Sequence, residues 1–500
     1  MGRNVESHLF GRKQIFTANE YITAENVVDE VNRALIIHLV NLQEEEYLYW
    51  YRRGLQPILE RTKEVRPEIC NKIVVNNAEQ VCAFKNGYFL QKPIAYVSRR
   101  GDDSVNDKVR LYNEYIYTSG KHKADNAVVD WFHTVGVGAL YVEPSRDSDR
   151  QKPVSVYALD PRSAFVVYSL RPGNRPVYGV NMVVNGDKLI FDVFTERSKF
   201  TLEGGWSGQS FPFDMTNVAP ATSLAQSVIS EEPNILGLIP IIEYTYNAQR
   251  MSAFEPAISI MDAINLVESN RADGVEQTIQ QLCVAINCQF DEGVTANEIR
   301  QAGMIALTST NEHKEDFKIL TESLDQAQTQ VTLDDLYQQM LFKCSMPSTT
   351  SGGQRSTSDT GTAVYLRDGF QTADTAARNT TDLFEASNRY FDEIFLKILR
   401  LKGLLDLGLN DFELRIERNS TSNLLTKTQA ALNMKELGLA PQIVLERSGI
   451  SSDPLTDIEV SADYMAARWL TNDEADEDPA TSEVGGNVVR SYVRRSPTVE

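Results

Sequence analysis

The first quarter of the chain has apolar residues at helical spacing. A stripe beginning at Val27 predicts a helix over 23–53, with Thr23 as its N-cap. The aromatic and basic run at 47–54 is interpreted as a helix end packing on a domain core, because no wider basic surface accompanies it. Further helices are predicted over 71–87, 105–118 and 125–134, with a short extended piece at 88–94.

Residues 135–245 alternate between apolar and polar positions, which is typical of β-strands. Asn185-Gly186 lies between two alternating runs and indicates a hairpin turn. The stretch 202–236 is rich in Gly, Ser and Pro and is predicted to be a long surface excursion. Together with the helices before them, these strands predict an α+β domain over 1–250. The predicted strands cover 135–142, 165–168, 178–180, 189–194 and 239–246.

A long apolar stripe follows and predicts a helix over 255–280, about 39 Å long at the usual rise. Ser252 and Glu255 form a capping-box pattern, and Pro256 falls in the first turn, where its missing N–H costs nothing. The stripe consists of Phe254, Ile258, Met261, Ile264, Val267, Val275, Ile279 and Leu282, with Arg271 in place of one apolar member. The other face is acidic and polar and carries Asp262, Asn265, Glu268, Asn270, Asp273 and Glu276.

A small insert at 283–322 separates this helix from a second one predicted over 325–345. About forty residues can barely hold a core alone, so the insert is expected to gain stability from neighbouring subunits. Within it the pattern predicts a turn at 289–293, a short helix at 295–302, and strands at 304–308 and 317–320. The second helix carries Leu333, Leu336, Met340 and Cys344 in register.

A polar loop at 346–361 follows the second helix. It has no apolar residue after Pro347, eight hydroxyl side chains, and two adjacent glycines that allow the backbone to adapt. A third helix is predicted over 363–401, about 57 Å long if straight. Gly369 and Thr375 are weak points at which we expect a bend. The remainder predicts a strand at 411–418, helices at 423–437 (with Gly438 as C-cap), 442–447 and 454–469, and a flexible acidic tail from 471.

The length and charge of the chain narrow its class. Five hundred residues predict two to four domains, and 42% hydrophobic with 24% charged residues is typical of a soluble globular protein. A net charge of −20 disfavours tight nucleic-acid binding over a broad surface, although weak contact with a sliding duplex is allowed. The N-terminus shows no secretory signal and no apolar window could span a bilayer, so we expect a cytosolic protein without a membrane partner.

The sequence shows no chemistry that would indicate an enzyme. The five cysteines and five histidines are scattered, which favours free thiols and no metal site. There is no GxxxxGK[ST] and no GxSxG, and the acidic residues at 334–335 and 473–478 are interpreted as solvated charge. A structural role without catalytic residues, cofactor or metal is therefore favoured.

A series of short motifs, taken in their order along the chain, indicates the function more specifically than composition does. They are Tyr51-Arg-Arg-Gly54, Lys63 to Ile69, Asn71 to Val74, Phe84 to Leu90, Pro93-Ile94, Ile239 to Tyr244, Met261 to Asn265 and Thr360 to Ala363. Over roughly residues 40–420, the chain resembles portal proteins from long-tailed (siphovirus-like) bacteriophages of Gram-positive hosts.

This resemblance implies a homo-oligomeric ring, usually of twelve subunits, at one capsid vertex of the virion. Double-stranded DNA would pass through it during packaging and ejection. The implied partners are terminase, a head–tail adaptor, and the major capsid and scaffolding proteins, with assembly in the host cytoplasm. The family's parts would be a wing (1–250 and 363–409), a stem (251–282 and 323–345), a clip (283–322), a tunnel loop (346–362) and a crown (410–470), with the tail 471–500 outside the resemblance.

The resemblance also implies candidate site residues. The stem would pack between neighbouring subunits through Ile258, Met261, Ile264, Val267, Val275, Leu336 and Met340, and Gly369 would kink the following helix. The tunnel loop would present Ser348, Thr349, Thr350, Ser351, Gly352, Gly353, Gln354, Arg355, Ser356, Thr357 and Ser358 to DNA. Arg355 is its only cation before Arg367, so the loop is expected to touch DNA without gripping it.

Two alternatives are carried beside the portal hypothesis. The first is another phage structural component, such as a head–tail connector or minor capsid protein, that never surrounds DNA. The second is a nucleic-acid enzyme of the packaging machinery, against which the missing P-loop weighs heavily.

Overall fold

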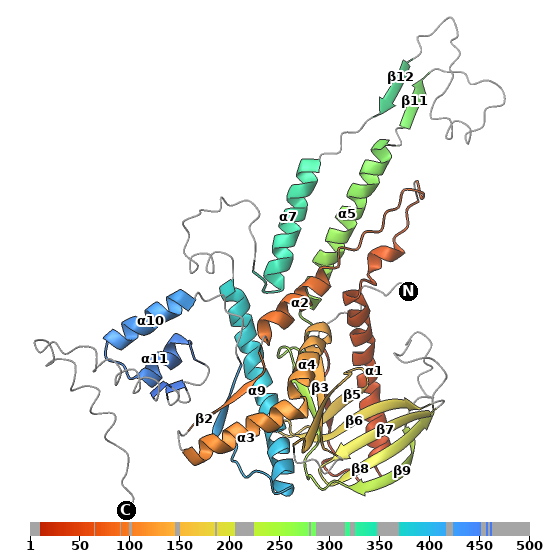
Figure 1. Cartoon of the computed structure of the whole chain (residues 1–500). Coiled ribbons are helices and arrows are strands. Elements are labelled where there is room, and N and C mark those ends of the chain that lie inside the picture. Colours follow the sequence, from red (N-terminus) through yellow and green to blue (C-terminus); the bar gives the residue numbers. More distant parts are fainter. Residues whose placement is uncertain are drawn as a thin grey trace, which may run out of the picture. The chain divides into compact units, whose positions relative to one another are not determined.

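The computed structural model describes residues 11–64, 66–90, 92–99, 103–145, 151–185, 188–205, 225–279, 282–286, 316–320, 326–347, 370–416, 424–451, 457–458 and 461–462. The chain divides into two compact units, residues 1–98 with 104–420 and residues 99–103 with 421–500. Helices and sheets both occur in the larger unit (Figure 1), which confirms a mixed helix and sheet fold.

The helices are α1 (Val27–Arg52), α2 (Asn77–Phe89), α3 (Asp103–Ser119), α4 (Lys121–Val135), α5 (Ile258–Ile279), α7 (Gln326–Lys343), α9 (Phe370–Leu401), α10 (Leu424–Glu436) and α11 (Pro441–Ser448), with 3₁₀ turns η1 (Pro57–Glu60) and η2 (Glu255–Ala257). The strands are β1 (Ile15–Thr17), β2 (Ala95–Ser98), β3 (Val137–Pro144), β4 (Val154–Leu159), β5 (Ala164–Ser169), β6 (Pro176–Asn185), β7 (Lys188–Thr195), β8 (Ser198–Gly205), β9 (Ala225–Pro233), β10 (Ile241–Thr245), β11 (Leu282–Ile286), β12 (Asp316–Leu320) and β13 (Phe412–Arg415).

A six-stranded sheet in the order β1-β5-β6-β7-β8-β9 forms the first layer. Helix α1 covers one face, because its apolar stripe from Val27 to Leu35 packs on alternate residues of β5 to β8. The hairpin predicted at Asn185 is confirmed, since Asn185 pairs with Lys188. The surface excursion predicted over 202–236 is wrong at both ends, where β8 and β9 pair antiparallel.

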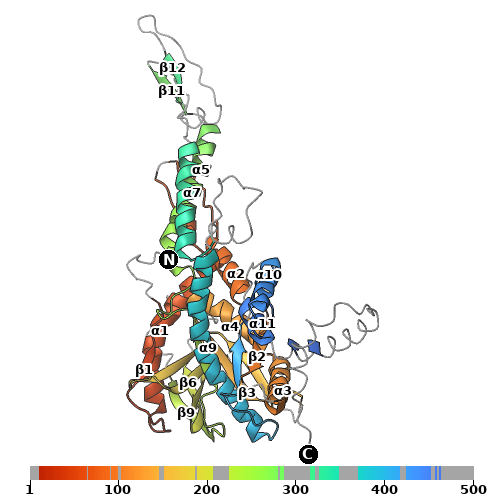
Figure 2. The same cartoon turned by 90° about the vertical axis from the view of Figure 1, so that its left-hand side faces the viewer.

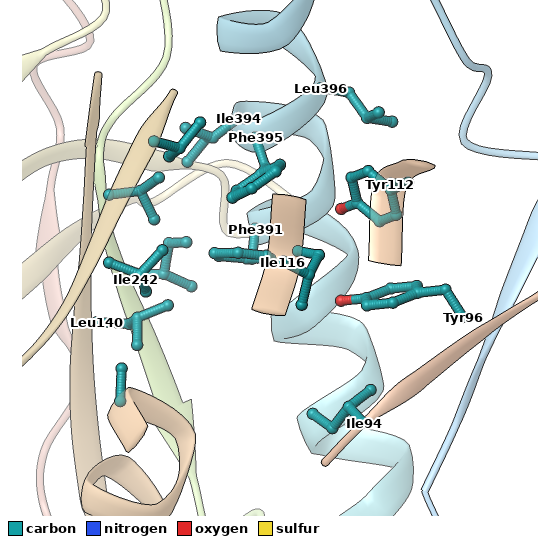
Figure 3. Close-up of a cluster of buried hydrophobic side chains, with 14 of the residues drawn as sticks. Ile94, Tyr96, Tyr112, Ile116, Leu140, Ile242, Phe391, Ile394, Phe395 and Leu396 are labelled. Carbon is teal, nitrogen blue, oxygen red and sulfur yellow. The ribbon is translucent and has the colours of Figure 1, made fainter. Parts of the chain in front are cut away.

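A second core lies between the three-stranded sheet β10-β3-β4 and the helices α3, α4 and α9. Figure 3 shows Phe391 and Phe395 of α9 between Leu140 and Ile242 on one side and Tyr112 on the other. Helix α9 therefore completes a core whose other buried members come from residues before 250 and from Leu405, Leu407 and Phe412. Asp392 on the same helix accepts hydrogen bonds of 2.8 Å from the hydroxyls of Tyr96 and Tyr112, and burial raises the pKa of Asp392 to about 7.

Most predicted elements are confirmed, and several boundaries need correction. The N-cap position of α1 is Asn26 and not Thr23, whose carbonyl instead accepts the N–H groups of Asn26 and Val27. Helix α2 continues through Gly87 to Phe89, because Tyr88 and Phe89 are buried. Leu282 belongs to strand β11 and not to the preceding helix. The insert's predicted turn, helix and first strand, the helix 454–469 apart from four residues, and the tail lie outside the described residues.

The smaller unit contains a pair of short helices. Helix α10 ends at Glu436, and Gly438 follows it with a φ of 81°, a left-handed conformation that favours glycine. The predicted C-cap role of Gly438 is confirmed by its N–H, which donates to the carbonyl of Lys435. Lys427 of α10 donates to the carbonyl of Gly449, just after α11.

Candidate functional site

Helices α5 and α7 form an antiparallel pair that we name the helix pair. They run side by side in both views and extend away from the sheets (Figure 1 and Figure 2). Beyond their ends, β11 and β12 form a two-stranded antiparallel ribbon. The pair is the candidate functional element because it corresponds to the predicted stem and carries the predicted stem residues.

The capping box predicted before α5 is partly formed. The carboxylate of Glu255 accepts the backbone N–H of Ser252 at 2.8 Å, whereas the hydroxyl of Ser252 accepts from Phe254 instead of Glu255. Pro256 lies in the 3₁₀ turn η2, where no N–H is required. Helix α5 therefore starts from a fixed point in the body of the larger unit.

The apolar stripe of α5 packs within one chain. Met261 and Ile264 are buried with Met340 of α7 in a core that also contains residues of α1 and α2, and Ile258, Val267 and Leu336 pack against that core half-buried. Met261, Ile264 and Met340 are therefore buried by their own chain, and the packing of the stripe between neighbouring subunits stays a prediction. Val275 is the exception, with 49% of its surface exposed.

The polar face of α5 is covered by residues 56–64 and 66–76, which we name the brace. Every second brace residue from 71 to 75 donates its backbone N–H to a side chain of α5. Asn71 donates to Asp273 at 2.7 Å, Ile73 to Ser269 at 3.0 Å, and Val75 to Asn265 at 2.9 Å. Extended backbone presents every second N–H to one side, and side chains four residues apart share one helix face, so the two periods match.

Asp273 carries the ionic part of this contact. It is 2% exposed and faces two brace cations, with distances to one carboxylate oxygen of 3.1 Å from Arg61 and 2.5 Å from Lys63. Burial works to raise the pKa of Asp273, but the hydrogen bonds from Lys63 and Asn71 outweigh it and hold the pKa below 3.8. Because the folded pKa is depressed, this stabilisation is present above about pH 4 and is lost as the pH falls further.

The brace begins where α1 ends, and this junction also contacts α5. Tyr51 is fully buried, and its hydroxyl donates to Asp262 at 2.8 Å. Burial raises the pKa of both groups, so the tyrosine stays a neutral donor. The side-chain amide of Asn265 donates to Gln56 at 2.5 Å. Asp262, Asn265 and Asp273 on the acidic and polar face of α5 are therefore occupied by their own chain, whereas Asn270 on the same face is exposed.

A buried charge cluster fixes the first described residues to the start of the helix pair. The guanidinium of Arg12 lies 2.9 Å from the Glu255 carboxylate, with 0% and 1% of the two side chains exposed. Arg12 also donates to the carbonyl of Val135 at 3.1 Å and faces Glu44 at 3.1 Å. Gly11 has a φ of 84°, and its N–H donates to Glu255. A Cβ there would lie 1.8 Å from the carbonyl oxygen of Gln249, so only glycine fits.

Glu45, beside this cluster, gives a pH prediction. Burial raises its pKa from 4.5 to about 8, and one carboxylate oxygen has no hydrogen-bond partner. Since the folded pKa is raised, the wild type is expected to lose stability as the pH rises from about 4.5 to about 8. Glu45→Gln should be more stable than wild type by about 1–3 kcal/mol at pH 8.5 and nearly equal to it at pH 5. Urea unfolding at both pH values measures this, and an equal difference at both would contradict it.

The C-terminal end of α7 fixes the point from which the predicted tunnel loop departs. Ser345 has a φ of 52°, and the N–H of Met346 donates back to Leu341 at 2.9 Å, which closes the helix in a Schellman-type turn. Ser345 and Ala373 of α9 line the same cavity of about 20 Å³, so the residues before and after the loop meet at one place.

The predicted loop residues, Ser348 to Ser358, and the predicted kink at Gly369 lie outside the described residues. Thr375, the other predicted weak point, lies inside the continuous helix α9. Arg12 was not singled out in the sequence, and the brace residues Lys63 to Ile69 and Asn71 to Val74 appeared there only as motifs of the family resemblance and not as partners of α5.

The described part of the chain gives no indication of metal binding or of a membrane-spanning helix. No group of three or more His, Cys, Asp or Glu side chains there could hold a metal ion. No helix in the described ranges is long and apolar enough to cross a membrane. Cys70, Cys82 and Cys344 are free thiols.

The chain is similar to a known protein family and to solved structures. The family model described as "Phage portal protein, SPP1 Gp6-like" matches residues 13–475. None of the curated proteins compared with the chain matches it. Among solved structures, the chain is similar to "Neck of empty GTA particle computed with C6 symmetry", with a TM-score of 0.42, 12% identity, and coverage of 74% of this chain and 89% of that chain. It is also similar to "Neck of native GTA particle computed with C12 symmetry", with a TM-score of 0.41, 14% identity, and coverage of 75% and 91%. TM-scores this low establish no shared fold.

Proposed function

The chain belongs to the SPP1 Gp6-like family of phage portal proteins, and we propose that it forms a ring at one vertex of the capsid through which double-stranded DNA passes during packaging and ejection. The family match over residues 13–475 carries this proposal. We further propose that the ring contains twelve subunits, as the motif resemblance implies, and belongs to a long-tailed phage of a Gram-positive host.

The parts of the chain would divide this work. In the proposal, the helix pair is the stem, and the ribbon β11–β12 belongs to the clip at which terminase and then the head–tail adaptor dock. The sheets with α9 are the wing, which meets the capsid and scaffolding proteins, and residues 410–470 are the crown. The brace supports this assignment, because its three backbone hydrogen bonds hold α5 along its polar face, in addition to the core that the helix pair shares with α1 and α2.

The loop between α7 and α9 would be the element that touches DNA. Ser345 before the loop and Ala373 after it line one cavity at the base of the helix pair. It offers hydroxyl and glycine residues and a single cation before Arg367. Few cations mean few deep energy wells for phosphates, which suits a duplex that must move past the loop in both directions.

Electron microscopy of the purified protein tests the ring. We expect negatively stained particles to show rings with a central hole about as wide as a duplex. A head–tail connector that never surrounds DNA would give particles without such a hole. A monomer that hydrolyses ATP would refute the proposal and favour a packaging enzyme.

Loop substitutions test the contact with DNA. Gly352→Pro removes the loop's adaptability and Arg355→Glu adds repulsion from phosphates, so each should reduce the amount of packaged DNA while leaving ring assembly intact. A packaging assay that measures nuclease-protected DNA provides the readout, with Thr357→Ser as a conservative control in the same loop. Unchanged filling of capsids by both variants would contradict a tunnel role.

A further inference from the structure

The face of α7 that points away from α5 carries exposed apolar side chains. Val331 is 68% and Phe342 is 74% exposed, whereas Leu333 and Met340 on the opposite face are buried. Val331, Asp335 and Phe342 lie on one stripe, because four and eleven residues correspond to about one and three turns. We name these three residues the α7 outer face. Single exposed apolar residues are common on protein surfaces, whereas two large ones on one helix face indicate an interaction surface.

The brace side of the helix pair carries a second apolar patch. Leu55 is 61% exposed, and Leu59, Ile73 and Trp50 are each 37% exposed. The ammonium of Lys72 donates to the carbonyl of Leu59 at 2.7 Å, which places Leu59 beside residues 72–73. We name these four apolar residues the brace patch.

The two surfaces lie on different flanks of α5. The brace contacts α5 through Asn265, Ser269 and Asp273, while α7 packs on the flank that carries Met261 and Ile264. Figure 1 shows α7 on one side of α5 and the brace with η1 on the other. The α7 outer face and the brace patch of one chain therefore point apart and cannot contact each other.

The two surfaces also match in height along α5. Arg271 of α5 donates to Gln330, so Val331 lies near the level at which Ile73 donates to Ser269. Tyr51 donates to Asp262 near the start of α5, and α7 reaches η2 at the same end, so Trp50 and Phe342 lie at a similar level.

Their charges are complementary. Asp334 and Asp335 are exposed and accept hydrogen bonds only from the neutral side chains of Gln330 and Gln339, so they have no cation in the described part of their own chain. On the brace side, Lys72 bonds to a carbonyl, and Arg53 stacks over the rings of Tyr49 and Trp50, so neither faces a carboxylate within the described ranges.

We propose that the α7 outer face of one chain docks on the brace patch of the next chain, with Asp334 and Asp335 facing Lys72 and Arg53 across the interface. This inference rests on the proposed ring and assigns its stem interface. The partner is a second copy of this chain because the α7 outer face and the brace patch are both present on every chain. They lie at the same level along α5, are both apolar, and carry opposite charges. Contact between two different surfaces is head-to-tail, and repetition of such a contact closes into a ring when the rotation allows it.

Charge reversal tests the pairing. Asp335→Lys places a cation opposite Lys72 and Arg53, so the subunit concentration needed for ring assembly should rise at least about tenfold. Lys72→Glu should weaken assembly in the same way, and the double variant Asp335→Lys/Lys72→Glu should recover most of it, because every interface in the ring then has the pair reversed. Analytical ultracentrifugation measures assembly. Asp382→Lys, at an exposed carboxylate on α9, is the matched control and should assemble as wild type does.

Cysteine cross-linking tests the contact itself. In a Cys70→Ser background, which removes the free thiol nearest to Ile73, Val331→Cys and Ile73→Cys in one chain should give a ladder of linked subunits on non-reducing gels after oxidation by diamide, and neither single variant should. If the wild type forms rings, but the double-cysteine variant gives no ladder and Asp335→Lys leaves assembly unchanged, the interface would be overturned and the ring would stand. Wild-type protein that forms no rings would refute the proposed function itself. A ladder with rescue by the double charge reversal supports both.

Discussion

Glu255→Ala is expected to lower the free energy of unfolding by about 3–5 kcal/mol, because it leaves the buried guanidinium of Arg12 without its closest carboxylate. The same carboxylate accepts the N–H groups of Gly11 at 3.2 Å and Ser252 at 2.8 Å, which would lose their partner. Glu44 stays 3.1 Å from Arg12 and still compensates part of its charge, so the loss of unfolding free energy should not exceed this range.

Denaturant unfolding measures the loss for Glu255→Ala against two controls. Glu255→Gln keeps the shape and one acceptor oxygen, which can accept from the Gly11 side or from Ser252 but not from both, so it should lose less than the alanine variant. Glu25→Ala, at an exposed position before α1, should lie within about 0.5 kcal/mol of wild type. A loss below about 1 kcal/mol for Glu255→Ala would show that residues 11–12 are not anchored at this cluster.

The elements with strong local patterns could be predicted from the sequence. The stripe beginning at Val27 predicted α1, alternation predicted β5 to β7, and the register of Leu333 and Met340 predicted α7. Strands β8 and β9 were missed because Gly, Ser and Pro lower β propensity, whereas backbone pairing of β8 with β7 and of β9 with β8 supplies their hydrogen bonds.

The partner of each helix face could not be predicted in the same way. Periodicity shows which side chains share a face of α5, but the element that covers the face is determined by the tertiary structure. The acidic face appeared free because its partner, the brace, is an irregular segment about 200 residues away in sequence. Asn71, Ile73 and Val75 contribute mainly backbone N–H groups, and every residue type except proline carries one. The opposite charges of Asp273 and of Arg61 and Lys63 were the feature of the sequence that could have indicated this contact.

The brace matters for the proposed ring in two ways. It donates hydrogen bonds to the buried side chains of Asn265 and Asp273 on the polar face of α5. It also displays Leu59 and Ile73, which belong to the proposed interface. Disrupting the brace should therefore affect assembly as well as local stability.

Asp273→Ala is expected to release the brace from α5 without unfolding the chain. The substitution removes the acceptor of the Asn71 N–H and the shared counter-ion of Arg61 and Lys63. Since the side chains of Arg61 and Lys63 are 12% and 22% exposed, both cations can regain water, and the local cost should be about 2–3 kcal/mol. Hydrogen exchange of the Ile73 and Val75 amides should accelerate roughly 100-fold, while core amides of β7 keep their protection.

The control for Asp273→Ala is Asn270→Ala, one turn earlier on α5. Asn270 is exposed and accepts only from Arg61, so its loss should change exchange in the brace by less than about threefold. If the proposed interface is correct, Asp273→Ala should also weaken ring assembly, because the released brace no longer holds Ile73 and Leu59 in place, whereas Asn270→Ala should assemble normally. Unchanged exchange of the Ile73 amide in Asp273→Ala would refute the brace. Accelerated exchange with unimpaired rings would retain the brace but remove its patch from the subunit interface.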